Sequence, residues 1–504
     1  MQCSARLLAI TATLALTATG AHAAVTISSG ATANMSCSNG VCAPTAPNAV
    51  LNSGDLEGFL ASGNLTVTTT GSGVQAKDIV VKAMLTWSAA TVLAFDSHRS
   101  ITLDRFVSVA GAGGLALTTN DGGKGGELNF GRRGHVEFVN LASSLTVDGK
   151  AYTLVNTVKG LASVITNNPT GNYAFADSYN AGQDGVYSSA PVASHFGGNL
   201  EGLGNSVSNL AIKDVARIGS GDGLFALVGS TGLVRDFNLT NVNIYVKGYR
   251  HGGYVPQSVG GLAAENDGWI SNSYATGEVE NGSLPKSPIG TGGLVGVNYG
   301  VIANSSATIQ SVGAFAGGVD GINYGVVTES IAAGFVDGGA EGGGLVGENE
   351  SPGVIMLSFA TASIYGCSEG GLVGDNSGNV TQSYATGSVS GSCWAGEFAG
   401  SNSGTMSQCY ATGAVSGGTT LGGFVGADYS VPGSISNGYW DTDTSGITNL
   451  SQGAGNVAND PGITGLTTAE FQSGLPAGFD PAVWGENSSI NGGLPYLLNN
   501  PPPK

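Results

Sequence analysis

The chain has few charged residues, and most of them are negative. Only 10% of its 504 residues are Asp, Glu, Lys or Arg, and the formal net charge is -18. The 17 Lys and Arg are scattered along the sequence, and the one adjacent pair, Arg132 and Arg133, is typical of a solvated turn. Because phosphate binding needs clustered cations, we expect no nucleic-acid partner.

Long apolar runs are also missing. A membrane helix needs about 18 continuous apolar residues, and no segment beyond the N-terminus provides them. At the N-terminus, Arg6 precedes an apolar run over residues 7–16, followed by the small-x-small triplet Ala21, His22 and Ala23. This pattern predicts a signal peptide over residues 1–23. We therefore expect a secreted protein, extracellular or at the cell surface, without a transmembrane span.

Cysteines are few, and an exported chain favours disulfides over zinc. Cys37 and Cys42 are close enough in sequence to form a disulfide. Cys367 and Cys393 each stand nine residues before an Asn of a repeat described below, so stacked coils would bring them together. We predict a disulfide between Cys367 and Cys393; the alternative is two small buried thiols. Cys409 lies in a small-residue column and is expected in the core.

Glycine is abundant, and it follows an internal repeat. The segment 369–391 reads EGGLVGDNSGNVTQSYATGSVSG, and the same order of residue types returns through the C-terminal half in steps of 32, 25, 26, 27, 26 and 26 residues. Such a period indicates one supersecondary unit stacked on copies of itself. The steps are counted from one Asn in each unit, namely Asn266, Asn298, Asn323, Asn349, Asn376 and Asn402, with Asp428 in the last.

Each repeat also carries an apolar column and two columns of small residues, from Ser273 to Cys409 and from Ala275 to Ala411. Small residues in the same place in every unit predict a narrow interior. Asn tolerates turn conformations, and stacked copies can hydrogen-bond to one another. We therefore assign the Asn column a structural role as a turn ladder.

Upstream of the repeats, short runs with period two between residues 64 and 139 predict half-buried strands. We expect these to form a second family of coils in the same rod. Helices are expected around residues 55–61 and 151–165 and in the segment GLTTAEFQSG, residues 465–474. The predicted fold is all-β, a right-handed parallel β-helix (β-solenoid) with capped ends and a few short helices.

The predicted organisation follows the composition along the chain. Residues 24–150 form an N-terminal cap and the first coils, 151–250 form transition coils with a short helix, 251–446 hold the repeats of about 26 residues, and 447–504 form a C-terminal cap. Because exposed sheet ends invite aggregation, both atypical ends are expected to cover the solenoid.

The motif GGLVGxN followed by NSYATGxV resembles the GLUG repeat of exported adhesins of the filamentous haemagglutinin type and of some immunoglobulin A peptidases. The resemblance spans about residues 50–497, including FGGNLEGLGNSVSNLAI upstream and GYWDTDTSG and INGGLPYL downstream. It implies a β-helical surface protein. The chain departs from the family in having no NPNG-like secretion signature, and the HExxH zinc motif of the peptidases is absent.

Acidic residues occur in two patterns that suit calcium. Acidic residues border several Asn turns, as at Glu348, Glu350 and Asp375, but an acidic solvated edge explains them as well. The segment from Asp441 to Gly446 begins like a calcium loop, yet Gln452 stands where a bidentate Glu is needed. The sequence therefore assigns no cofactor, and Asp441, Asp443 and Ser445 remain weak calcium candidates.

No set of nucleophile, base and orienting group is apparent, so we predict that the chain is not an enzyme. Acid pairs such as Glu278 and Glu280 alternate with apolar residues and indicate an outward strand face. Tyr274, Tyr384 and Tyr410 take equivalent positions in the repeat and favour a packing ladder over exposed sugar-stacking rings.

The predicted function is adhesion, with a cell-surface glycan or protein bound along an extended face, and self-association of the rods is left open. The alternatives are a carbohydrate-active β-helix enzyme, either a polysaccharide lyase or a hydrolase, and a passive structural stalk or filament subunit.

Overall fold

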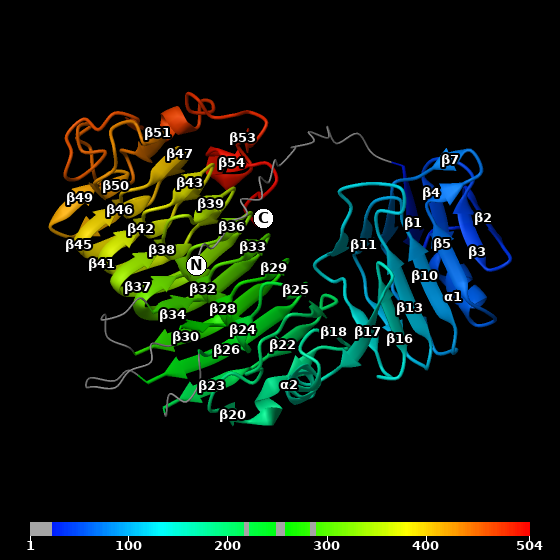
Figure 1. Cartoon of the computed structure of the whole chain (residues 1–504). Helices are drawn as coiled ribbons and strands as arrows, with labels where there is room; N and C mark the ends of the chain where they lie inside the picture. Colours follow the sequence, from blue (N-terminus) through cyan, green and yellow to red (C-terminus); the bar gives the residue numbers. More distant parts are fainter. Residues whose placement is uncertain (1–22, 216–220, 248–257, 283–288, 504) are drawn as a thin grey trace, which may run out of the picture.

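The computed structural model describes residues 23–215, 221–247, 258–282 and 289–503. The predicted signal peptide therefore lies almost wholly outside the described residues. Among the described residues, no helix is long and apolar enough to cross a membrane. The fold is an all-β parallel β-helix with a few short helices, as predicted, but it forms two stacks of coils that lie side by side (Figure 1).

The smaller stack, which we call the N-terminal β-helix, comprises residues 24–154. Its strands alternate buried and exposed side chains, and residues such as Ile27, Leu51, Ile79 and Leu103 are fully buried inside it. Three rows of parallel strands form its walls. They are β1 (Ala24–Ser28), β4 (Ala49–Asn52), β8 (Asp78–Val81), β11 (Ile101–Leu103) and β14 (Leu128–Phe130); β9 (Leu85–Trp87), β12 (Val107–Val109) and β15 (Val136–Phe138); and β5 (Leu65–Thr68), β10 (Val92–Asp96), β13 (Gly114–Thr118) and β16 (Ser144–Val147).

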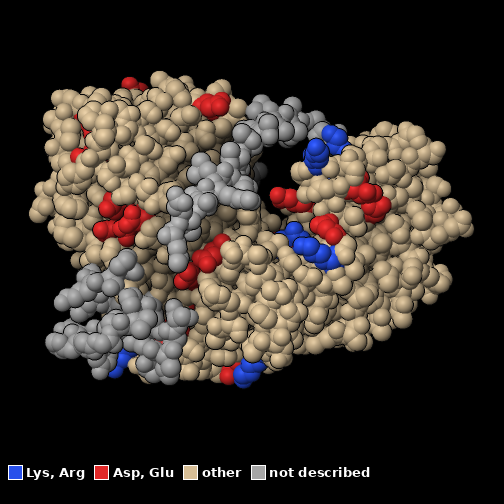
Figure 2. All heavy atoms as spheres, in the orientation of Figure 1, with Lys and Arg blue, Asp and Glu red and all other residues tan. Residues whose placement is uncertain are grey.

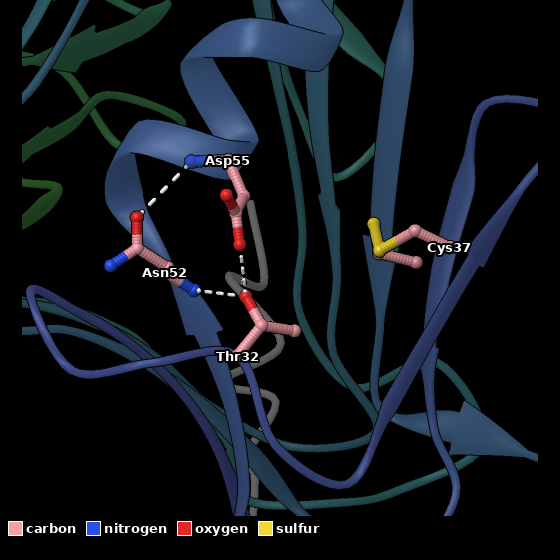
Figure 3. Close-up of a disulfide and its surroundings, with 5 residues drawn as sticks. Thr32, Cys37, Asn52 and Asp55 are labelled. Atoms are coloured by element: carbon pink, nitrogen blue, oxygen red, sulfur yellow. Dashed lines mark hydrogen bonds between the residues drawn. A yellow bond between two sulfur atoms is a disulfide. The ribbon is translucent and has the colours of Figure 1, made fainter.

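The first coil closes one end of this stack. The hairpin of β2 (Met35–Ser38) and β3 (Val41–Pro44) places Cys37 opposite Cys42, and a disulfide joins them. Asn52 caps helix α1 (Ser53–Leu60): its side chain accepts hydrogen bonds from the backbone of Gly54 and of Asp55, the second of which is drawn in Figure 3. Such a cap satisfies amides that the first turn leaves unpaired. A short hairpin, β6 (Thr70–Gly71) with β7 (Val74–Gln75), contacts β3.

A hairpin reverses the chain between the two stacks. β16 pairs antiparallel with β17 (Lys150–Val155) across Asp148 and Gly149, whose φ angles are 48° and 75°. Helix α2 (Val158–Asn167) follows, capped by Thr157, so residues 151–155 of the expected helix are strand. The expectation of one continuous rod is therefore wrong, because this two-residue turn starts a second stack with its own core.

The second β-helix begins with β18 (Asn172–Phe175) and contains the repeats. One of its walls is the eight-stranded sheet of β24 (Phe225–Val228), β28 (Ala263–Asn266), β32 (Val295–Asn298), β35 (Asp320–Asn323), β38 (Val346–Asn349), β42 (Val373–Asn376), β46 (Ala399–Asn402) and β50 (Val425–Asp428). The next row comprises β21 (Asn199–Glu201), β25 (Leu233–Arg235), β29 (Trp269–Ser271), β33 (Val301–Ala303), β36 (Val326–Thr328), β39 (Val354–Met356) and β43 (Asn379–Thr381), and β47 (Thr405–Ala411) and β51 (Ile435–Asp441) continue it.

The remaining strands form the third side of these coils. The long ones are β26 (Asn238–Val246), β30 (Tyr274–Asn281), β34 (Ser306–Gly317) and β37 (Ile331–Gly343). The others are β19 (Tyr179–Asn180), β20 (Val186–Tyr187), β22 (Ser206–Ser208), β23 (Ala211–Asp214), β27 (Val259–Gly260), β31 (Gly290–Gly292), β40 (Phe359–Ala360), β41 (Ser363–Gly370), β44 (Tyr384–Ala385), β45 (Val389–Gly396), β48 (Val415–Gly417), β49 (Thr420–Gly422) and β52 (Ile463–Leu466).

The repeat columns stack in register through these coils. Ile270 pairs with Ile302, and the same apolar column continues to Ile435. The Asn column is buried, and the side-chain amide of each Asn donates to the side chain of the next at 2.8 Å, from Asn266 up to Asp428. A disulfide joins Cys367 to Cys393 on neighbouring coils, with 4.7 Å between the Cα atoms.

The C-terminal segment both ends the stack and folds back along its side. Strand β52 pairs with β51, and helix α3 (Thr468–Phe471) and the pair of β53 (Trp484–Gly485) and β54 (Tyr496–Leu497) then run down the outside (Figure 1). There Phe471, Phe479 and Trp484 cover a ladder of stacked rings, Phe359, Tyr384 and Tyr410.

Candidate functional site

A polar cleft of about 420 Å³ lies between the two β-helices. The gap between the two bodies is open to solvent in Figure 2. One wall is the turn after β14 in the N-terminal β-helix, and the other is the corner that leads into β26, β30 and β34 of the second. The lining residues are Asn129, Phe130, Gly131, Arg132, Gly134, Gly204, Asp236, Asn238, Asn272, Ser273, Tyr274, Asn304 and Ser306.

Direct contacts between the two β-helices hold the base of this cleft. In the edge strand β15, the backbone N–H of Val136 donates to the Leu203 carbonyl at 3.0 Å, and that of Phe138 donates to the Ala176 carbonyl at 2.8 Å. The buried Asn205 side chain donates back to the Val136 carbonyl at 2.8 Å. Because buried backbone groups are costly when left unpaired, these bonds fix how the two walls face each other.

The wall from the second β-helix is built by a column of residues in the left-handed region. Asp236, Asn272 and Asn304 have φ angles of 54°, 49° and 46° and occupy the same corner of successive coils. Asn and Asp adopt this conformation more readily than other residues with a Cβ. The Asn304 side chain donates to that of Asn272 at 2.6 Å, so the amide groups are held in place.

An aromatic ring stands beside this amide column. Tyr274 belongs to the column that continues as Ser306, Ile331, Phe359 and Tyr384. The C-terminal segment covers the upper rings, as the packing-ladder prediction requires, but Tyr274 is 37% exposed and lines the cleft. Tyr274, Tyr384 and Tyr410 hold equivalent positions in the repeat. The C-terminal segment covers Tyr384 and Tyr410, whereas Tyr274 is left open to the cleft.

Carboxyl groups lie in and beside the cleft. Asp236 is 5% exposed, and its Oδ2 atom has no hydrogen-bond partner among the described residues. Burial raises its pKa well above the usual value, as does the charge of Glu201, while Arg235 and a hydrogen bond from Asn272 oppose the rise. In the next coil beyond Asn304, burial and the facing Glu127 of the N-terminal β-helix raise the pKa of Glu329.

The calcium candidates lie elsewhere and are engaged in turn and cap hydrogen bonds. Asp441 accepts from the Asp443 backbone at 2.9 Å and from the Thr468 hydroxyl at 2.6 Å. Asp443 accepts from the Thr468 backbone at 3.0 Å, and the Ser445 hydroxyl accepts from the Ile447 backbone. These bonds fix the loop against the start of α3. The oxygens proposed as calcium ligands thus hold the local structure together.

Three acidic residues of the repeats form a separate cluster, with Glu341 on β37 and with Glu348 and Asp375 on β38 and β42 of the eight-stranded sheet. Carboxylate oxygens of Glu341, Glu348 and Asp375 lie within 4.8 Å of one another. Burial is the main cause that raises the pKa of Glu341 to about 7 and that of Glu348 to about 8, and their neighbours' negative charges add to it. Beside the cluster, the rings of Tyr299 and Tyr324 stack at 5.0 Å.

No family model and no curated protein matches the chain. Among solved structures, it resembles a "putative immunoglobulin A1 protease" from Bacteroides ovatus, with 15% identity, 69% of this chain and 93% of that chain covered, and a TM-score of 0.38. A second structure, named IgA1 protease, shares 18% identity and a TM-score of 0.36 over 57% of this chain. The match spans 21% of that protein's length.

Both neighbours carry the names of proteases, which contradicts the prediction that the chain is not an enzyme, and we withdraw that prediction. TM-scores this low assign no activity to the chain. The resemblance to GLUG-repeat adhesins, unmatched by a family model, stays a proposal.

Proposed function

We propose that this chain is an exported, adhesin-like protein that binds a glycan in the cleft between its two β-helices. The observation that carries the proposal is the combination of fixed side-chain amides, hydroxyls and one open ring, at Asn272, Asn304, Ser306 and Tyr274, in one hollow. The adhesive role itself rests on the resemblance to GLUG-repeat proteins.

The chemistry of this lining suits a sugar. Side-chain amides both donate and accept hydrogen bonds, as sugar hydroxyls do, and a ring such as Tyr274 offers an apolar face with a polar edge. The hydrogen bond between Asn304 and Asn272 holds their amides in place before a ligand arrives, which lowers the entropic cost of binding. The cleft thus replaces the extended face as the binding surface that we propose.

Export is part of the proposal. Besides the signal-like sequence of residues 1–23, the chain has two disulfides, Cys37–Cys42 and Cys367–Cys393. Disulfides persist in oxidising compartments and are rare in the cytosol. Fractionation of cells that express the full chain should place it outside the cytoplasm, with both disulfides formed.

Tyr274→Ala tests the cleft. We expect purified wild-type protein to bind members of an immobilised glycan library, and the variant to bind them at least fivefold more weakly because the stacking face is lost. Tyr365→Ala is the matched control, because Tyr365 is 54% exposed on β41 and does not line the cleft. Equal loss in both variants, or no glycan binding by wild type, would reject the proposal.

A second candidate function is glycan cleavage in the same cleft, favoured by Asp236, which lines the cleft and whose buried Oδ2 atom has no hydrogen-bond partner among the described residues. Burial raises the pKa of Asp236, and a protonated carboxyl group is the general acid of glycoside hydrolysis. Release of reducing ends from a bound glycan, lost in Asp236→Asn but kept in the control Asp337→Asn, would establish it. Binding without any release would leave the binding function alone.

A further inference from the structure

The N-terminal β-helix carries a column of cations that are far apart in the sequence. Val81, Leu103 and Phe130 stack in register at the ends of β8, β11 and β14. The turns that follow these three strands carry Lys82, then Arg105, then Arg132 and Arg133. The separations of 23 and 27 residues between Lys82, Arg105 and Arg132 are one coil each, so the four side chains gather at one corner. We call them the basic column.

The basic column lines a second hollow of about 400 Å³, together with Asp104. All four side chains are exposed, and none of them makes an ion pair within the part of the chain that the structure describes. Arg105 donates to the backbone carbonyl of Asp104. In a chain with only 17 Lys and Arg and a net charge of -18, four unpaired cations at one corner form a local positive site.

This second hollow adjoins the cleft, because Arg132 lines both. Figure 2 shows Lys and Arg side chains, with Asp and Glu side chains beside them, on the edge of the N-terminal β-helix that borders the gap. A ligand that lies against Tyr274 and the amide column can therefore pass Arg132 and reach Arg105 and Lys82. Cations placed along one side of a polar groove are suited to a ligand with repeated negative charges.

We propose that the glycan is anionic, with carboxylate or sulfate groups held by the basic column while its sugar rings occupy the cleft. This inference rests on the proposed function, since it names the ligand class of the same site. Arginine forms paired hydrogen bonds with the flat oxygen pairs of carboxylates and with phosphate-like groups. The column has three arginines in its four positions, so it binds either carboxylate or sulfate.

The test compares matched oligosaccharides on the full chain by calorimetry: a neutral one, its carboxylated counterpart and its sulfated counterpart. We expect at least one anionic form to bind about tenfold more tightly than the neutral form in low salt. This ratio should fall as salt is raised, because screening weakens exposed charge pairs. Which of the two anionic forms binds more tightly identifies the source of the charge.

The double variant Arg105→Gln with Arg133→Gln should bring the ratio of anionic to neutral affinity close to one. The control, Lys124→Gln with Lys150→Gln, removes two exposed cations outside both hollows and should keep the ratio. Thermal unfolding of both variants checks that they are folded.

The outcomes separate the two proposals. Equal affinity for neutral and anionic forms at all salt concentrations overturns the charge inference and leaves glycan binding in place. Binding of no saccharide at all rejects both. Column-dependent binding of a single-stranded oligonucleotide instead of any saccharide would also overturn them, because it would assign the column to phosphate.

Discussion

At the scale of single residues, the Asn at one register position of each coil builds the hydrogen-bonded ladder of the second β-helix. Asn323 is fully buried, accepts from Asn298 and from the Gly325 backbone, and donates to Asn349 at 2.8 Å. The period of the Asn in the sequence was sufficient to predict such a ladder, because stacked coils bring equal positions together. The left-handed residues Asn272 and Asn304 follow the same logic, but only the three-dimensional arrangement shows that they face a cleft.

Asn323→Ala should lower the free energy of unfolding by about 2–4 kcal/mol. The change removes the shortest of the hydrogen bonds that the Asn298 amide donates and leaves the buried Asn349 carbonyl oxygen without its ladder partner. An unsatisfied buried group costs roughly 1–3 kcal/mol, and the lost side-chain volume adds to this cost. Urea unfolding followed by circular dichroism measures the loss. Asn379→Ala is the control on an exposed position of β43 and should change stability by less than about 1 kcal/mol; equal effects would refute a special role for the ladder.

At the scale of elements, the sequence predicts the repeats better than the joints between them. The coils over residues 259–446, the helix near residue 55 and the short helix in GLTTAEFQSG appear where their patterns indicate. The reversal at Asp148 and Gly149 was missed, although Asp-Gly between two apolar-alternating runs is a strong hairpin signal. The cleft could not be predicted, because it depends on how the two stacks pack against each other through Leu203 and Asn205.

The C-terminal segment offers an element-scale prediction. Trp484 is 1% exposed, and its ring lies 5.8 Å from that of Tyr410 and 4.7 Å from that of Phe479. Trp484→Ala should weaken the packing of the C-terminal segment on the second β-helix by about 3–5 kcal/mol, because the change removes a large buried side chain. We expect the segment to become sensitive to protease and the uncovered Tyr384 and Tyr410 rings to bind a hydrophobic dye.

Trp394→Ala is the matched control for this experiment, because Trp394 is 37% exposed on β45. It should leave protease resistance and dye binding near the wild-type values. If both variants behave alike, the C-terminal segment does not depend on the aromatic cluster for its place on the second β-helix.

At the scale of the whole molecule, buried carboxyl groups make stability depend on pH. Burial raises the pKa of Asp222 and of Glu341 to about 7 and that of Glu348 to about 8, whereas ordinary unfolded carboxyls titrate near 4. Between about pH 4 and pH 8 the folded chain therefore holds more protons than the unfolded chain. Its stability falls as pH rises through this window.

Thermal unfolding should therefore occur a few degrees higher at pH 5.5 than at pH 8.5. The double variant Glu341→Gln with Glu348→Gln should flatten this dependence, because two of the responsible groups no longer titrate. A midpoint that rises from pH 5.5 to pH 8.5 would show that the buried carboxyl groups do not control stability.

The central claim is that a glycan occupies the cleft between the two β-helices. A crystal structure of the chain with a bound oligosaccharide, found by the library screen, tests this most directly. The account predicts sugar density against the Tyr274 ring, with hydrogen bonds to Asn272 and Asn304 and the chain continuing past Arg132. Sugar density on the sheet that carries Tyr299 and Tyr324, with the cleft left to water, would contradict it.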